Sequence, residues 1–146
     1  MLRRILIASV LLLAITPIVQ ARDDRQTYKI QDVLDSADFK DKADNQVAFY
    51  FGNQPSGRIK EKLGSYVANK KTNGFNKSNE NGCRWAMLSA LFGLRDRALK
   101  EGGDAVINIE SYYDREEIAD KTMYECHTGA FVTGVTLKGT VVKLAK

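Results

Sequence analysis

The sequence is poor in residues that commonly carry chemistry. It contains two cysteines, one tryptophan and a single histidine, His127, among 146 residues. No CxxC or HxxxH metal spacing is present, and the GxSxG pattern of serine hydrolases is absent as well. Any histidine-dependent catalysis would therefore have to use His127, and the sequence favours a protein that is not an enzyme.

A nucleotide-binding loop is also missing. Gly52 and Gly57 have the spacing of GxxxxGK[ST], but Arg58 and Ile59 stand where the lysine and the hydroxyl residue are needed. The segment is a turn by composition. Gly102–Gly103 follows a helical pattern instead of opening one, which is typical of a helix C-cap and not of an anion site. We expect no cofactor.

Long apolar runs are confined to the beginning of the chain. Arg3 and Arg4 precede an apolar run that ends before Pro17, and small residues follow up to Ala21. This pattern predicts a signal peptide over residues 1–21, cleaved after Ala21, although an N-terminal membrane anchor is the alternative. No cysteine follows the cleavage point, so we expect no lipid anchor. The expected location is periplasmic or secreted, with no membrane-spanning segment after cleavage.

The mature chain is expected to form one domain over residues 22–146. Removing 21 of 146 residues leaves 125, enough for one modest core. The loss of Arg3 and Arg4 lowers the formal net charge from +4 to +2. Such a mild charge favours no nucleic-acid partner, and we expect none.

The two cysteines suggest a covalent link. In an oxidising compartment an even count favours a disulfide, here Cys83 to Cys126. A free thiol pair and a metal site that adds His127 remain alternatives. A nucleophile formed by Cys126 and His127 is disfavoured, because neighbours on a strand point to opposite faces. Cys83 with His127 stays geometrically possible.

The strongest helical pattern covers residues 79–101. Apolar residues recur at helical spacing from Cys83 to Ala98, and Trp85 and Phe92 lie on a second stripe beside them. Two stripes predict a helix that is buried on more than one side. Ser78 or Asn79 is expected to cap its start.

The rest of the chain reads mainly as strands. Alternating or β-branched segments predict them near residues 47–51, 65–71, 105–113, 122–127 and 135–144. A short helix is expected to start near Asp32. Residues 22–26 are charged and are expected to fray.

Charged residues gather in two segments. One is basic and forms a candidate interaction face for a protein or an envelope component: Arg58, Lys60, Lys62, Lys70, Lys71 and Lys77. The other, residues 114–120, is acidic, but its spacing matches no EF-hand loop. Solvated surface is the alternative for both segments.

Several stretches resemble a known group of proteins. The run CRWAMLSALFGLRDRALKEGGDAVINIESYY, the later MYECHTGAFVTGVTLKGTVVKLAK, and upstream FYFG and YVANKKTNGFNKS resemble short exported bacterial proteins often named "excinuclease ATPase subunit". Such a subunit needs Walker motifs, which this chain lacks, so the name does not describe its chemistry. More remotely, GGDAVINI with a late GTVV strand is similar to the YbjQ-like domain and to the lipoprotein sensor of the Rcs envelope-stress pathway.

These resemblances imply a small α+β domain without catalytic residues. We therefore expect one long helix packed on a mostly antiparallel, YbjQ-like sheet. The expected function is that of an exported, non-enzymatic binding or interaction protein, related to envelope stress through the resemblance. The alternative is a metal-binding protein that uses Cys83, Cys126 and His127.

Overall fold

The computed structural model describes residues 21–146, so the expected signal peptide lies outside the described residues apart from Ala21. Within that range no helix is long and apolar enough to cross a membrane. The elements in chain order are β1 (Asp24–Lys29), α1 (Ile30–Leu34), α2 (Ala37–Lys42), β2 (Ala48–Phe51), β3 (Ile59–Asn73), α3 (Asn79–Glu101), β4 (Ala105–Ser111), a 3-10 turn (Tyr113–Arg115), β5 (Met123–Thr128) and β6 (Val132–Leu144).

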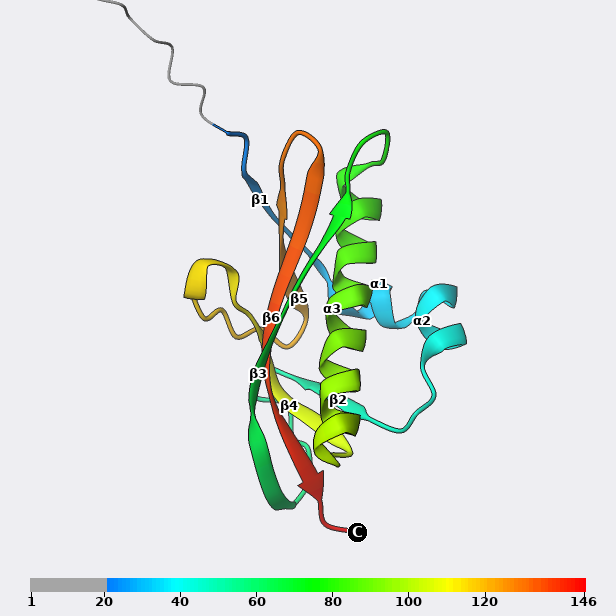
Figure 1. Ribbon diagram of the computed structural model, residues 1–146, viewed down its shortest axis with the longest axis vertical. Coiled ribbons are helices and arrows are strands. Elements are labelled where there is room, and N and C mark those ends of the chain that lie inside the picture. Colours follow the sequence, from blue (N-terminus) through cyan, green and yellow to red (C-terminus); the bar gives the residue numbers. More distant parts are fainter. Residues whose placement is uncertain (1–20) are drawn as a thin grey trace, which may run out of the picture.

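The strand β6 is the centre of one six-stranded sheet. It pairs antiparallel with β3 along one edge. Its other edge is shared, since its first residues pair with β5 and its second half pairs with β4. β1 extends the sheet beyond β5 and is antiparallel to it, whereas β2 extends it beyond β4 in parallel. A mostly antiparallel sheet under one long helix confirms the predicted α+β class (Figure 1).

Helix α3 has the limits and caps that its sequence predicts. The Ser78 side chain accepts a hydrogen bond from the Asn81 N–H, and Gly102 ends the helix in the left-handed conformation at φ 76°. The first apolar stripe is fully buried on the sheet, with Met87, Leu91 and Leu94 at most 1% exposed. Truncating one of these leucines to alanine is expected to cost about 2–5 kcal/mol.

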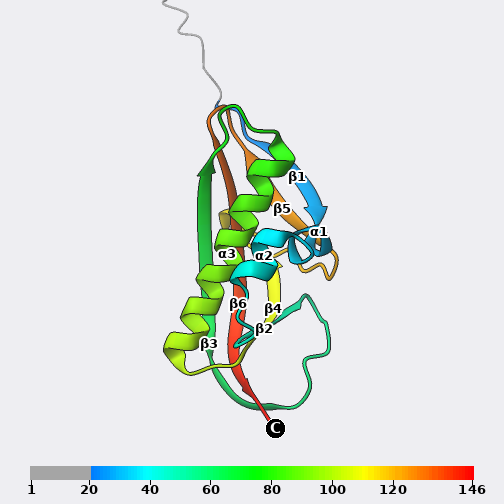
Figure 2. The same cartoon turned by 90° about the vertical axis from the view of Figure 1, so that its right-hand side faces the viewer.

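The second stripe of α3 is covered by the short helices. Phe39 of α2 stacks on Phe92, with ring centroids 5.9 Å apart, and the Lys42 ammonium lies 5.3 Å from the Trp85 ring centroid. Figure 2 shows α1 and α2 beside α3, on the side away from β3. The stripe is not buried at its end, because Leu99 is 39% exposed.

One expectation from the sequence is wrong, and one predicted strand is too short. Residues 22–26 do not fray, because β1 begins at Asp24 and pairs with β5 through six residue pairs. Its inward positions, Asp24, Gln26 and Tyr28, are mostly polar and only half-buried, so no hydrophobic alternation announces the strand.

The strand predicted at residues 65–71 is present, and it is longer than predicted, from Ile59 to Asn73. Its register shifts near Gly64, which has φ 128°. A β-bulge adds one residue and thereby changes which positions face inward. The half-buried residues Leu63 and Tyr66 are consequently three apart, which is why the segment also resembles a helix.

Candidate functional site

The disulfide fastens the start of α3 to the sheet. Cys83 lies in the second turn of α3 and Cys126 lies on β5, both fully buried, with Cα atoms 5.8 Å apart. The predicted disulfide is thus confirmed. A sequence separation of 43 corresponds to a stabilisation of about 4 kcal/mol in the chain-entropy model.

Strand β5 divides its side chains between two environments. Tyr124 and Cys126 face α3, and Glu125 and His127 face the opposite side of the sheet. The structure therefore does not bring the Cys83–Cys126 sulfurs and the imidazole together. Residues 21–146 contain no group of three or more His, Cys, Asp or Glu side chains that could hold a metal ion. Metal binding through these three residues stays a prediction for the reduced chain.

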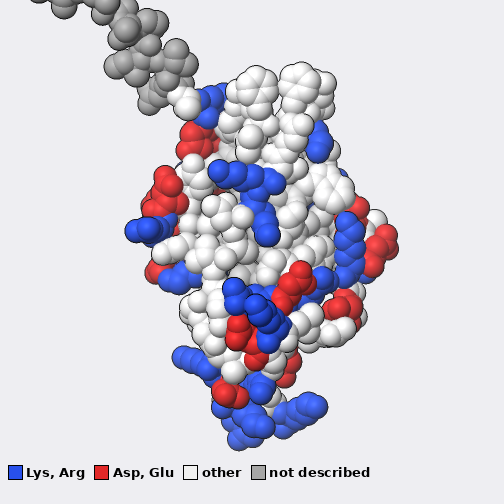
Figure 3. All heavy atoms as spheres, in the orientation of Figure 1, with Lys and Arg blue, Asp and Glu red and all other residues white. Residues whose placement is uncertain are grey.

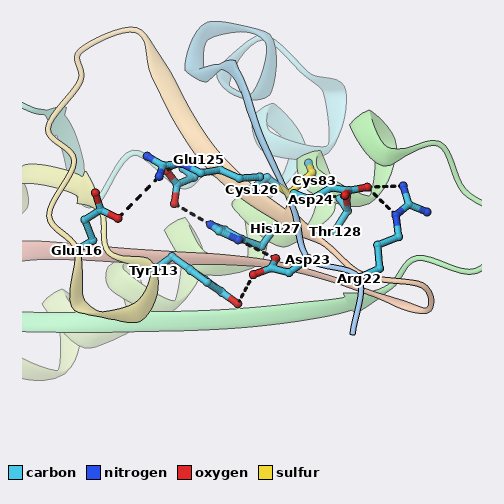
Figure 4. Close-up of polar contacts among 11 residues, drawn as sticks. Arg22, Asp23, Asp24, Cys83, Tyr113, Glu116, Glu125, Cys126, His127 and Thr128 are labelled. Atoms are coloured by element: carbon cyan, nitrogen blue, oxygen red, sulfur yellow. Dashed lines mark hydrogen bonds and ion pairs between the residues drawn. A yellow bond between two sulfur atoms is a disulfide. The ribbon is translucent and has the colours of Figure 1, made fainter. Parts of the chain in front are cut away.

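The His127 ring is enclosed by acidic and aromatic groups (Figure 4). Its Nδ1 lies 2.9 Å from Asp23 Oδ1 and its Nε2 lies 2.7 Å from Glu125 Oε1. The Tyr113 ring stacks on it, with centroids 3.3 Å apart and planes inclined by 10°. Both ring nitrogens thus have carboxylate partners, and His127 joins β5 to the residue that precedes β1.

Glu125 is the centre of this ionic cluster. Its side chain is 5% exposed, and its Oε2 lies 2.5 Å from the Arg25 Nε. Arg25 also lies 3.8 Å from Glu116, and the Glu125 N–H donates to the Ser111 hydroxyl. The cluster therefore links β1, β4, β5 and the loop after β4.

The loop after β4 carries backbone strain beside this cluster. Asp114 and Arg115 both have positive φ, 50° and 67°, which is costly for residues other than glycine. Burial, followed by the hydrogen bond to Asp23, raises the pKa of Tyr113. The strained turn holds the Tyr113 ring over His127.

The basic segment does not form one surface. Because β3 is extended, Arg58, Lys60 and Lys62 lie near one end of the sheet and Lys70, Lys71 and Lys77 lie toward the other. The first group shares its end with Lys143 and Lys146, beside a groove that Arg58 and Lys60 line. Figure 3 shows the corresponding concentration of basic side chains at the end where the C-terminus lies.

Acidic side chains of residues 114–120 form contacts within the fold. Glu117 forms an ion pair with Lys138. Asp120 accepts hydrogen bonds from the backbone N–H groups of Thr122 and Met123 and from the Thr122 hydroxyl, which lower the pKa of its carboxyl group. These carboxylates shape the loop.

A pocket of about 290 Å³ lies between β1, α1, β5 and the start of α3. We call it the Arg84 pocket, and its lining includes Tyr28, Asp32, Val33, Glu80, Arg84 and Tyr124. Its volume is at the lower end of the range for small-molecule sites. The sequence reasoning missed it, because four separate elements contribute to it.

One buried polar atom in this pocket has no hydrogen-bond partner within the described range. The Arg84 Nε is buried and makes no hydrogen bond, and the guanidinium makes one bond, from NH2 to the Asn81 Oδ1 at 3.0 Å. Tyr124 is 3% exposed, and burial raises the pKa of its phenol strongly. Tyr28, Glu80 and Asp32 add to that rise and Arg84 opposes it. Buried polar groups are normally hydrogen-bonded.

The lining of the Arg84 pocket therefore contains positively and negatively charged side chains together with a small apolar surface. The guanidinium can receive a carboxylate or phosphate, and Asp32 and Glu80 can receive a cation. Comparison with protein-family models gives no match, and comparison with curated proteins gives none either. The site geometry is consequently the basis for a functional proposal.

Proposed function

We propose that this protein is an exported, non-enzymatic binding protein whose ligand is a small zwitterion of amino-acid size, held in the Arg84 pocket. The observation that carries the proposal is the buried Arg84 Nε, which makes no hydrogen bond within residues 21–146 and belongs to a pocket that Tyr124 also lines. A ligand with a hydrogen-bond acceptor would satisfy the Arg84 Nε.

The charges in the pocket support a zwitterion over a simple anion. Arg84 is accompanied by Asp32 and Glu80, so an anion alone would meet repulsion as well as attraction. A molecule with separate carboxylate and ammonium groups complements both signs. Val33 and the tyrosine rings leave room for a modest apolar side chain.

Export is supported by the character of the fold. The buried Cys83–Cys126 disulfide fits an oxidising compartment. An involvement in envelope stress, which the family resemblance implies, stays a prediction. The absence of catalysis is tested by an activity screen of the wild type against His127→Ala, for which we expect identical profiles.

Calorimetric titration with free amino acids tests the binding function. The same amino acids in N-acetylated form, which lack the cation, and in amidated form, which lack the anion, serve as matched ligands. We expect binding of a free amino acid at least about tenfold tighter than of either derivative, equivalent to about 1.4 kcal/mol.

Protein variants locate that binding. Arg84→Gln and Tyr124→Phe are expected to abolish or weaken it, whereas Arg97→Gln is expected to leave it unchanged. Arg97 lies on the same helix and pairs with Glu101 at the surface. Binding of none of these ligands, or equal binding by all three variants, would contradict the proposal.

A further inference from the structure

Two phenylalanines project from one end of the molecule. Phe75, in the loop before α3, is 58% exposed, and Phe131, in the β5–β6 hairpin, is 66% exposed. Their ring centroids are 6.2 Å apart, and the neighbouring Val132 is 47% exposed. We call these three residues the apolar tip. Contiguous exposed apolar side chains usually mark an interaction site.

The apolar tip is fixed by its backbone. The Gly74 N–H donates to the Phe131 carbonyl at 2.8 Å, and the Gly129 N–H donates to the Val132 carbonyl at 2.8 Å. The first bond joins the two loops and the second closes the hairpin. Both rings are thus held together in an exposed position, which lowers the entropic cost of binding.

Two lysines flank the apolar tip, whereas the nearby Asp23 and Asp24 are paired with His127 and Arg22. Residues 71–79 contain Lys71 and Lys77 but no acidic residue, and residues 128–134 contain no charged residue. Neither lysine has an ion-pair partner among residues 21–146. Figure 3 shows uncharged side chains forming this end of the molecule, with basic atoms on either side and acidic atoms below those on one side.

The described chain also enters the fold at this end. A Cβ atom placed on Gly129 would lie 3.3 Å from the Arg22 carbonyl oxygen, so Arg22 runs beside the β5–β6 turn. Figure 1 shows β1 beginning at the same end as the two loops. Cleavage after Ala21 would add the positive charge of a new α-amino group here.

We propose that the apolar tip docks this protein on an anionic phospholipid bilayer. Phe75 and Phe131 enter the interfacial layer, where aromatic side chains are favoured, and Lys71 and Lys77 lie against the lipid phosphates. Lys71 and Lys77, unpaired within the described chain, favour an anionic membrane over a second copy of the chain, since in a dimer of tips these lysines would face one another and repel. This surface is separate from the Arg84 pocket, and neither proposal depends on the other.

Vesicle co-sedimentation tests the docking. The probes are vesicles of phosphatidylcholine alone and of equal parts phosphatidylcholine and phosphatidylglycerol. We expect the wild type to bind the anionic vesicles, with binding that weakens as salt is added. Phe75→Ser/Phe131→Ser is expected to weaken binding about tenfold or more. Lys71→Gln/Lys77→Gln is expected to weaken it about fivefold per lysine, on anionic vesicles only.

Matched controls use equivalent residues elsewhere. Val67→Ser/Leu99→Ser removes two other exposed apolar side chains, which are 52% and 39% exposed, and Lys60→Gln/Lys62→Gln removes lysines at the opposite end. Both are expected to bind as the wild type does. Failure of the wild type to bind anionic vesicles, or equal losses in the controls, would overturn the proposal.

Two further measurements distinguish membrane docking from self-association at the apolar tip. In the Phe131→Trp variant, we expect the emission of the new tryptophan to shift to the blue when anionic vesicles are added. The wild type, which has only Trp85, serves as the reference. Sedimentation velocity is expected to show a monomer. A dimer that Phe75→Ser/Phe131→Ser dissociates, without vesicle binding, would make the apolar tip a self-association surface and overturn membrane docking.

Discussion

The two faces of β5 are stabilised in different ways. On the face toward α3, Tyr124 and Cys126 are joined to the helix by apolar packing and a covalent bond, and the Arg84 pocket opens beside them. On the other face, Glu125 and His127 are joined to β1 and the loop after β4 by charge. A single strand thus combines a contact set that salt barely affects with one that salt weakens.

Removing the Cys83–Cys126 disulfide is expected to change the free energy of unfolding the most. Cys83→Ala/Cys126→Ala is expected to lower the free energy of unfolding by about 4 kcal/mol, because the unfolded chain regains the entropy of an open loop. Urea denaturation at neutral pH measures it, and wild type treated with a reductant should behave similarly. A loss below about 1 kcal/mol would show that packing alone holds α3 on β5.

Removing the charge of Glu125, on the opposite face of β5, is expected to give the second-largest change in the free energy of unfolding. Glu125→Gln keeps the shape of the side chain but leaves Arg25 and His127 without their buried carboxylate, and we expect a loss of about 2 kcal/mol. Urea denaturation at low and high salt distinguishes charge from packing. Full stability of the variant would mean that the ionic cluster contributes nothing beyond its volume.

Alkaline titration tests the contribution of Tyr124, which lies on the side of β5 that faces α3. Burial raises the pKa of Tyr124 in the folded state, so the folded protein retains this proton where the unfolded chain releases it. The resulting stability is complete below the ordinary tyrosine pKa of about 10 and is lost as pH rises beyond it. Tyr124→Phe is expected to flatten this alkaline decline in the urea midpoint. Parallel profiles for wild type and variant would contradict it.

A surface ion pair provides the smallest effect and the matched control for Glu125. Glu117 pairs with Lys138 but is 54% exposed, so Glu117→Gln is expected to change the free energy of unfolding by less than about 0.5 kcal/mol. The two Glu→Gln variants, measured side by side, report how much burial matters. Similar losses in both would remove the distinction between the inner and outer charges.

Local sequence patterns account for the parts of the fold that local physics determines. The limits of α3, its Ser78 cap and its glycine stop follow from periodicity and capping. The disulfide follows from the cysteine count and the compartment that the expected signal peptide implies. The opposite orientation of Cys126 and His127 follows from strand geometry, and the structure confirms it.

The remaining features depend on contacts between distant residues. His127 and Asp23 are 104 positions apart, and β1 is a strand because β5 offers its backbone, not because its polar side chains favour one. The Arg84 pocket combines four elements, so no single stretch of sequence outlines it. The basic segment is divided into two separate groups because β3 runs through Gly64 as one strand, and the local sequence does not reveal this.

The Arg84 pocket is tested most directly by the NMR signal of the Arg84 Nε–H group in a ¹H–¹⁵N spectrum. We expect this signal to shift when a free amino acid is added, and to stay in place with the amidated form, which lacks the carboxylate that Arg84 would bind. The Arg97 Nε–H signal should not move in either titration. An Arg84 signal that is assigned and unmoved by every free amino acid would contradict the proposed ligand site.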